Sequence, residues 1–327
     1  MRNIHTIFVL GLIILLLFMS INALAQEDNS NEENHFSASV EVGAIWFNTT
    51  DQLFTDQYFA GDKNEKTDNL NSPADDFNII MPMVLFDLKY KFRDTDKEVY
   101  LKNPFESSDS ELTLGMAQTF SNKSKLDVSI FYGIGTVWKD PYIIRENRDK
   151  SDTNNFGLTI DYDINANLNL SYRYNQVDVD QDIIGQRFND LERDGMIHSA
   201  GIGYKVNLDR SNIIIPRFEY TKADMDGESN RYNGCKLEIG YMRMKKDYIL
   251  SAFVSVDKRD YEENHPIFNE TRDDKEYSAT AIFTLLNPFG YNKFFTNFIV
   301  GYNYSNSNID FYDKRTYISG ITTGFKF

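Results

Sequence analysis

Apolar and polar residues alternate with a period of two over much of the chain from Phe36 to its end. One segment shows the pattern plainly, with apolar positions at Leu126, Val128, Ile130, Tyr132 and Ile134. Successive side chains of a β-strand point to opposite faces of the sheet, so this period predicts strands that have one apolar and one polar face. The sequence therefore predicts an all-β fold.

The predicted strands are long, and their connections alternate between short and long. Segments of roughly 9–13 residues suit a tilted strand that crosses a bilayer, whereas strands of soluble proteins mostly have about 5–6 residues. The expected short connections are 93–97, 121–124, 165–167, 208–211, 244–247 and 287–293. The expected long connections are 49–76, 139–154, 177–195, 222–232, 258–276 and 305–315. Short turns on one side and long loops on the other are typical of an outer-membrane β-barrel.

The segments predict a transmembrane antiparallel β-barrel of about fourteen strands over residues 36–327, an even number as in bacterial barrels. The predicted strands are 36–48, 77–92, 98–103, 110–120, 125–138, 155–164, 168–176, 196–207, 212–222, 233–243, 248–258, 276–286, 294–304 and 316–327. The weakest is 98–103, which is short, and twelve strands is the alternative count. Pro82 and Pro216 have no N–H for the ladder, and a closed barrel has no free edge, so a β-bulge is expected at each.

In a membrane barrel the apolar face contacts lipid and the polar face lines the lumen. The charged residues expected to line the lumen are Glu41, Asp87, Lys89, Lys91, Glu111, Asp127, Asp161, Asp163, Arg173, Lys205, Arg217, Glu219, Lys236 and Glu238. Both signs occur, so neither cation nor anion selectivity is favoured. Glycines on the same face, among them Gly115 and Gly157, are expected to leave room for a modest channel. Inward phenylalanines such as Phe131 also keep a path for apolar solutes open.

Aromatic residues collect at both ends of the predicted strands, on the apolar face. Those beside the short turns are Tyr90, Phe92, Phe120, Tyr162, Tyr204, Tyr241, Phe294, Phe325 and Phe327. Those at the loop ends include Trp46 and Trp138. Aromatic belts at the two membrane interfaces are expected anchors of a barrel.

The N-terminus has the features of a signal peptide. Arg2 precedes an apolar run at 7–19, and the small residues Ala23–Ala25 offer a cleavage site. An uncleaved anchor is the alternative, but the run is shorter than the about 20 residues of a spanning helix. The expected organisation is a signal peptide at 1–25, cleaved near Ala25, a flexible polar lead at 26–35, and the barrel.

Composition removes several functional classes. The net charge of −15 provides no basic stripe for nucleic acid, and one cysteine excludes a disulfide framework.

His198 and Ser199 are neighbours, but adjacent strand residues face opposite sides, so His198 cannot activate Ser199. His265 lies in a predicted loop, where a structural role is favoured. The acidic stretch Asp178–Gly185 resembles a calcium loop without its required glycine, so a turn is favoured. No enzyme, cofactor or metal is expected.

The chain ends on the alternating segment YISGITTGFKF, Tyr317–Phe327. We expect it to be the closing strand of the barrel, paired with the first strand. Its terminal Phe327 resembles the signal read by the outer-membrane assembly machinery, although the internal glycine of that pattern would fall at Thr322.

A resemblance to known proteins is carried by residues 83–95, 137–142, 220–230, 265–277 and 307–327. These stretches resemble a family of Gram-negative outer-membrane proteins known as domain of unknown function 2860. The resemblance spans most of the chain and implies an outer-membrane barrel, but brings no substrate or catalytic residue.

The function expected of such a barrel is passive diffusion of small solutes through the outer membrane of a Gram-negative bacterium. The alternative is a non-conducting surface barrel, whose acidic loops bind lipopolysaccharide through divalent cations or contact a host or phage protein. An outer-membrane enzyme is the least favoured class.

Overall fold

A computed structural model describes residues 35–55, 64–93, 95–103 and 110–327. The predicted signal peptide and nearly all of the polar lead lie outside the described residues. Phe36–Phe327 forms one compact unit. No helix among the described residues is both long and apolar enough to cross a membrane.

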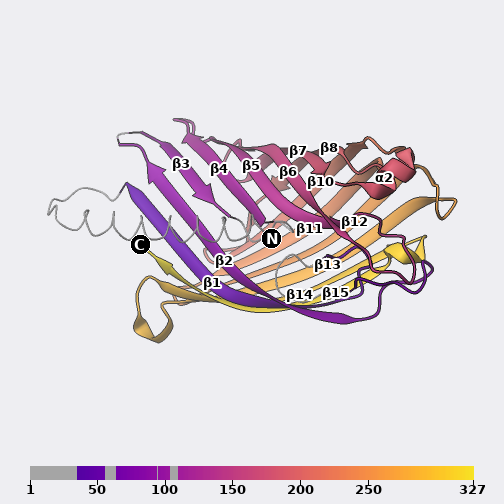
Figure 1. Cartoon of the computed structure of the whole chain (residues 1–327). Coiled ribbons are helices and arrows are strands. Elements are labelled where there is room, and N and C mark those ends of the chain that lie inside the picture. The colour runs from indigo at the N-terminus through magenta and orange to yellow at the C-terminus, as the bar shows by residue number, and fades with distance from the viewer. Residues whose placement is uncertain (1–34, 56–63, 94, 104–109) are drawn as a thin grey trace. The chain divides into compact units, whose positions relative to one another are not determined.

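The described strands form one antiparallel sheet that closes on itself (Figure 1). They are β1 (Phe36–Thr49), β2 (Phe77–Lys91), β3 (Lys97–Lys102), β4 (Ser110–Thr119), β5 (Lys125–Trp138), β6 (Lys150–Asp163), β7 (Leu168–Val179), β8 (Gly195–Tyr204), β9 (Val206–Asn207), β10 (Asn212–Met225), β11 (Tyr232–Met244), β12 (Tyr248–His265), β13 (Glu270–Leu286), β14 (Phe294–Ser307) and β15 (Lys314–Lys326). Short helices lie in the connections: α2 (Ile183–Arg187), η1 (Asn189–Leu191), η2 (Glu228–Asn230), η3 (Pro288–Gly290) and η4 (Asp310–Tyr312).

The barrel wall has fourteen strands, as predicted, so the alternative of twelve is wrong. The two-residue β9 continues β8, because both pair with β10 in one register, Gly203 opposite Arg217 and Val206 opposite Ile214. The closing strand is β15, which pairs with β1 on one side and β14 on the other. The C-terminal segment thus has the predicted place, and no edge of the sheet is left beside it.

The bulges predicted at the two prolines are absent, because the ladder accommodates each proline in another way. Pro82 faces Ala44 of β1 in an unbroken register, and β3 pairs with β2 only from Asp87 onward. Pro216 faces Ile239 in an unbroken register, while its other side lies at the interruption between β8 and β9. A proline fits into a strand wherever no ladder hydrogen bond requires the N–H that it lacks. A gap in strand pairing on one side of the proline provides such a position.

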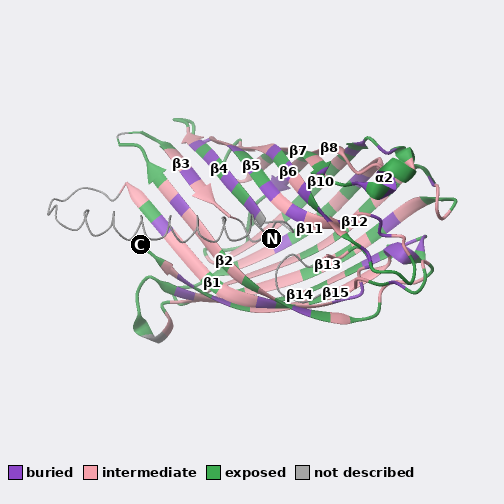
Figure 2. Cartoon of the chain, in the orientation of Figure 1, coloured by how far each residue is buried: buried purple, intermediate pink, exposed green. Residues whose placement is uncertain are grey.

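The alternation in sequence becomes an alternation in exposure (Figure 2). On β5, Ile130 and Tyr132 are 47% and 46% exposed, whereas Phe131 is 1% exposed. Apolar side chains are also exposed along other strands, among them Val42, Val84, Leu114, Leu237, Val254, Val300 and Ile321. A soluble sandwich would bury this apolar face in its core, but the barrel turns it outward, as a wall surrounded by lipid requires.

Glycines on the inner face make room for aromatic rings. The ring of Tyr100 lies over Gly115, that of Phe131 over Gly157, and that of Phe295 over Gly324. A Cβ at any of these three glycines would overlap the ring beside it. The expectation that Gly115 and Gly157 leave open channel space was therefore wrong, because neighbouring strands fill that space.

The strands extend further at the long-loop end than the sequence pattern indicates. β12 and β13 are joined only by residues 266–269, although a loop was expected over 258–276. Charged residues such as Lys258 and Asp273, which pair at 3.4 Å, lie there, and they hide the period of two because both faces are polar. The barrel wall thus continues past its apolar zone.

Candidate functional site: a capped barrel with a charged interior

The long loops meet in a cluster of apolar and aromatic side chains, here called the cap cluster. Its members are Leu70, Tyr142, Phe268, Ile309, Phe311 and Tyr312. Tyr142 belongs to the β5–β6 loop and Phe311 to the β14–β15 loop, and their rings are 5.1 Å apart. These loops leave the wall at places far apart around the ring of strands in both directions, so their contact crosses the mouth of the barrel.

His265 lies at the centre of the cap cluster and is 2% exposed. Its Nε2 is 3.0 Å from the hydroxyl of Tyr142 and 2.8 Å from that of Tyr312, and these two hydroxyls are 2.5 Å apart. The backbone N–H of Ile267 donates to its Nδ1 at 3.3 Å. Burial lowers the pKa of His265 to about 3, and the charge of Arg272 acts in the same direction. The ring is therefore neutral at neutral pH and contacts residues of three loops, and its structural role stays a prediction.

Arg272 brings a positive charge to the same cluster. Its guanidinium lies 3.4 Å from the ring centroid of Tyr312 and pairs with Asp274 at 2.6 Å. Burial raises the pKa of Tyr142 to about 12, so this hydroxyl keeps its proton. The centre of the cap thus holds one neutral imidazole, two neutral phenols and one compensated cation.

Arg148 ties the first loop to the cap. It is 2% exposed and donates to the backbone carbonyls of Gln52 at 3.0 Å and Pro141 at 3.1 Å, and also to that of Asn64. Its guanidinium covers the ring of Trp138 at 4.6 Å. Trp138 was expected in an aromatic belt, but at 1% exposure it is buried beneath the β5–β6 loop. Trp138 keeps its place in the alternation of β5. It is covered by Arg148, and no local pattern shows this tertiary contact.

Arg193 joins the β7–β8 loop to the end of β5. It donates to the carbonyls of Trp138 at 2.7 Å and Lys139 at 3.2 Å, and pairs with Asp182 at 2.6 Å. Asp182 also accepts the N–H of Gly185 and so caps α2. The stretch that resembled a calcium loop uses this carboxylate for structure. Within the described ranges, no group of three or more His, Cys, Asp or Glu is arranged to hold a metal ion.

Further hydrogen bonds and an ion pair join the long loops to neighbouring segments. The N–H of Gly227 donates to Glu192, and the hydroxyl of Ser229 donates to the carbonyl of Asn264. Arg315 pairs with Asp76 at 2.9 Å at the opposite side of the ring. Among the described residues, contacts therefore link long loops to one another at several places around the mouth.

The predicted lumen residues lie on the inner face in two kinds of arrangement. Some form ion pairs: Arg173 with Glu111 at 2.7 Å, Lys89 with Asp87 at 2.8 Å, and Lys236 with Glu238 at 3.4 Å. Lys236 also lies opposite Glu219 in the ladder, and Glu41 accepts a hydrogen bond from Asn297 at 2.7 Å. Lys91 lines a cavity of about 170 Å³. The guanidinium of Arg173 also stacks on Phe131 at 3.6 Å, so the inner wall is well packed here.

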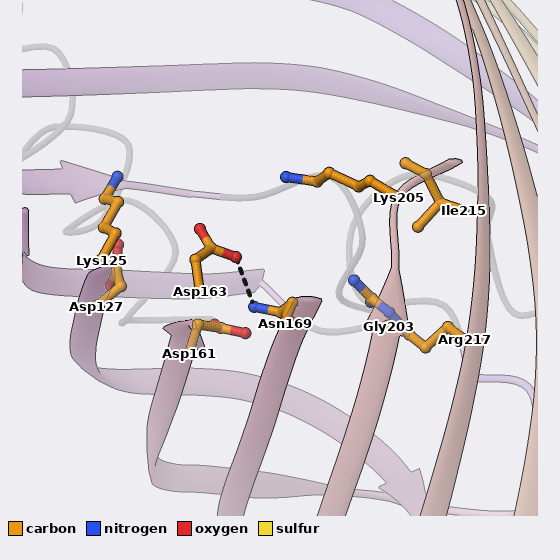
Figure 3. Close-up of a pocket in the computed structure, with 9 residues that line it drawn as sticks. All are labelled: Lys125, Asp127, Asp161, Asp163, Asn169, Gly203, Lys205, Ile215 and Arg217. Atoms are coloured by element: carbon orange, nitrogen blue, oxygen red, sulfur yellow. Dashed lines mark hydrogen bonds between the residues drawn. The ribbon is translucent and has the colours of Figure 1, made fainter. Parts of the chain in front are cut away.

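The other predicted residues surround a cavity of about 250 Å³ near the short-turn end (Figure 3). Its lining residues are Lys125, Asp127, Asp161, Asp163, Asn169, Gly203, Lys205, Ile215 and Arg217. Tyr100 donates to Asp127 at 2.6 Å, and Asn169 donates to Asp163 at 3.1 Å. Sequence reasoning missed Lys125, although it shares the strand and face of Asp127. Here the structure brings together charges from three strands, β5, β6 and β10, with Lys205 just beyond the end of β8.

Comparison with known proteins places the chain in a family. The model of the family described as "Protein of unknown function (DUF2860)" matches residues 35–327. The chain belongs to this family. No curated protein matches the DUF2860 chain.

Solved structures that are similar to the DUF2860 chain include the following three. CymD monoaromatic hydrocarbon channel is 7% identical, with 90% of this chain and 89% of that chain covered and a TM-score of 0.45. LpxR from Salmonella typhimurium is 16% identical, with 66% and 88% covered and a TM-score of 0.41. OmpT, an outer membrane protein of Vibrio cholerae, is 7% identical, with 92% and 100% covered and a TM-score of 0.43. These values assign no substrate or activity to the DUF2860 chain.

His198 and Ser199 lie on opposite faces of β8 in this DUF2860 protein, as predicted. His198 Nδ1 is 2.8 Å from the hydroxyl of Tyr172, on the exposed face. Ser199 Oγ is 2.9 Å from Thr221 Oγ1. The hydroxyl of Ser199 thus has a threonine as partner, and this pair offers no base to activate it.

Proposed function

We propose that the protein spans the outer membrane and allows small polar solutes to diffuse through it, with the loop cap controlling entry. The observation that carries the proposal is the 250 Å³ cavity, whose lining holds charges of both signs on the inner face. A barrel of about fourteen strands is wider than the eight-stranded kind that side chains fill. An inner wall with charges grouped around a cavity suits the passage of hydrated solutes better than a purely structural core.

The separation of opposite charges across the cavity supports the same proposal. Among the described residues, no ion pair within 4.0 Å joins Asp161 to Lys205 or to Arg217. Opposite charges that served only to fill the barrel would be expected to close on each other, because an unpaired charge in a dry interior is costly. Charges that stay apart across a cavity indicate contact with water.

Single-channel conductance in a planar bilayer tests the proposal. The refolded protein is expected to conduct in short openings, and the double variant Tyr142→Ala/Tyr312→Ala to stay open longer, because it removes both hydroxyls that contact His265. Tyr172→Ala removes an outer-face tyrosine and is the matched control, with gating expected as in the unchanged protein. A bilayer that stays silent with the double variant, although heat-modifiable migration shows a folded barrel, would refute the channel.

A non-conducting surface barrel is the second candidate, and the linked loops favour it. Contacts such as Arg148 with Gln52 and Ser229 with Asn264 make a fixed outer surface suited to recognition. Exposed acids at the same end, among them Asp190, Asp224 and Glu228, would attract divalent cations between the protein and lipopolysaccharide. Calcium-dependent binding of lipopolysaccharide by a protein that conducts under no condition would favour this candidate.

A further inference from the structure

We propose that the cavity near the short-turn end is a binding site for a small zwitterionic solute, with its ammonium group at Asp127 and Asp161 and its anionic group at Lys205 and Arg217. The inference rests on the proposed channel, because the solute reaches the cavity through the lumen.

Most charges of the cavity lie on two walls; the exception is Lys125, which stands on the acidic wall opposite Asp163 and pairs with Glu98 at 3.2 Å. Asp127 of β5 faces Asp161 of β6 directly in the ladder, so two carboxylates stand side by side. Arg217 of β10 faces Gly203 of β8, and its Nε would lie 3.6 Å from a Cβ at that glycine. Arg217 thus extends over β8 at this glycine. Figure 3 shows the carboxylates on one side of the view and Lys205 with Arg217 on the other.

Neutral residues separate the two walls. Between β6 and β10 the cavity is lined by Asn169 of β7 and Gly203 of β8. Neighbouring strands lie about 4.8 Å apart, so three steps place the backbones of Asp161 and Arg217 roughly 14 Å apart along the wall. The two charged groups thus face a common space without meeting in it.

The balance of charge favours a zwitterion over a simple ion. The lining contains three carboxylates and three cationic side chains, Lys125, Lys205 and Arg217. A cation gains at the acidic wall and is repelled at the basic wall, and an anion has the reverse difficulty. A solute with both charges matches both walls at once, and its ammonium group relieves the repulsion between Asp127 and Asp161.

The volume sets the size of the solute. A cavity of about 250 Å³ holds roughly eight waters at about 30 Å³ each. A linear amino acid with a few carbons between its charged groups displaces a comparable amount of water. We therefore choose 4-aminobutyrate as the probe, with butyrate and butylammonium as probes that each carry one of its two charges.

Isothermal titration calorimetry on the full-length, detergent-refolded barrel tests the site without requiring conductance. 4-Aminobutyrate is expected to bind at least tenfold more tightly than butyrate or butylammonium. Asp161→Asn and Arg217→Gln are each expected to weaken its binding at least tenfold. Arg210→Gln, in the exposed β9–β10 turn, removes a charge at the same end and is expected to leave binding unchanged.

The outcomes separate the site from the channel. Equal affinity for the three probes, or unchanged affinity in both cavity variants, would overturn the zwitterion site. Conduction by a protein that does not bind 4-aminobutyrate would overturn the site and leave the channel standing. Binding by a barrel that never conducts would support the site and overturn the channel. Heat-modifiable migration of each variant shows that it is folded.

Discussion

Acid is expected to loosen the cap through His265. In the closed cap the pKa of this ring is about 3, because it is buried beside Arg272. In an open cap, in water, a histidine has a pKa of about 6.5. The closed state therefore binds fewer protons, and its stability falls as the pH drops below about 6.5 and continues to fall toward 3. Tyr142 and Tyr312 keep their protons, and Arg272 keeps its charge against Asp274.

The size of this effect follows from the two pKa values. Between pH 7.5 and pH 5.5, protonation of the open state alone favours opening by about 1.4 kcal/mol, or about tenfold in the open population. This window lies above the titration of ordinary carboxyl groups, which have a pKa of about 4. Most of the pH dependence in it is therefore expected to come from histidine.

Amide hydrogen exchange measures the opening. The N–H of Asn269 donates to the carbonyl of His265 at 2.7 Å, and that of Ile267 donates to its ring. After correction for the intrinsic exchange rate, both amides are expected to show about tenfold more opening at pH 5.5 than at pH 7.5. His265→Gln is expected to remove this dependence, and His198→Gln, on the outer face, to retain it. A flat profile in the unchanged protein, or a retained slope in His265→Gln, would refute the reasoning.

Three further changes test the wall and its assembly. Gly157→Leu is expected to destabilise the barrel by about 1–3 kcal/mol in urea unfolding, because its side chain meets Phe131. A leucine at half-buried Thr296 serves as control, and equal stability of the two variants would contradict the packing. Arg173→Gln is expected to cost about 1–3 kcal/mol in the same measurement because Glu111 is left buried without its cation, and an unchanged midpoint would show that water replaces it. Deletion of Phe327 is expected to lower the fraction of folded, heat-modifiable barrel in outer-membrane extracts, and normal insertion would count against its recognition by the assembly machinery.

The sequence predicted the wall well because lipid imposes a regular pattern on it. Residues such as Ile130 and Leu114 must be apolar on one face, so strand number and the closing strand follow from counting. Bulges at Pro82 and Pro216 were wrongly predicted. Whether a proline needs a bulge depends on where pairing with the neighbouring strand begins or ends, and the local sequence does not determine this.

The candidate sites differ in how far they follow from the sequence. The charges of the cavity share one face of consecutive strands, so alternation places Asp127 and Asp161 together. The cap could not be predicted, because Tyr142 and Tyr312 are 170 residues apart and no periodicity links two loops. The role of Arg148 could not be predicted from local sequence either. It donates hydrogen bonds to three backbone carbonyl groups that only the folded loops bring close to it.

The place of the cap cluster across the mouth has a consequence for the order of folding. Its partners leave the wall from distant strands, and they face each other only after β15 has paired with β1 over 267 residues of separation, as Thr316 does with Thr49. Contacts of such sequence separation form late, because long loops must close before those contacts can stabilise the fold. The cap is therefore expected to form only in a closed barrel, and a chain still open between its first and last strands lacks it. Resistance of the loops to protease then distinguishes a finished barrel from one still being assembled.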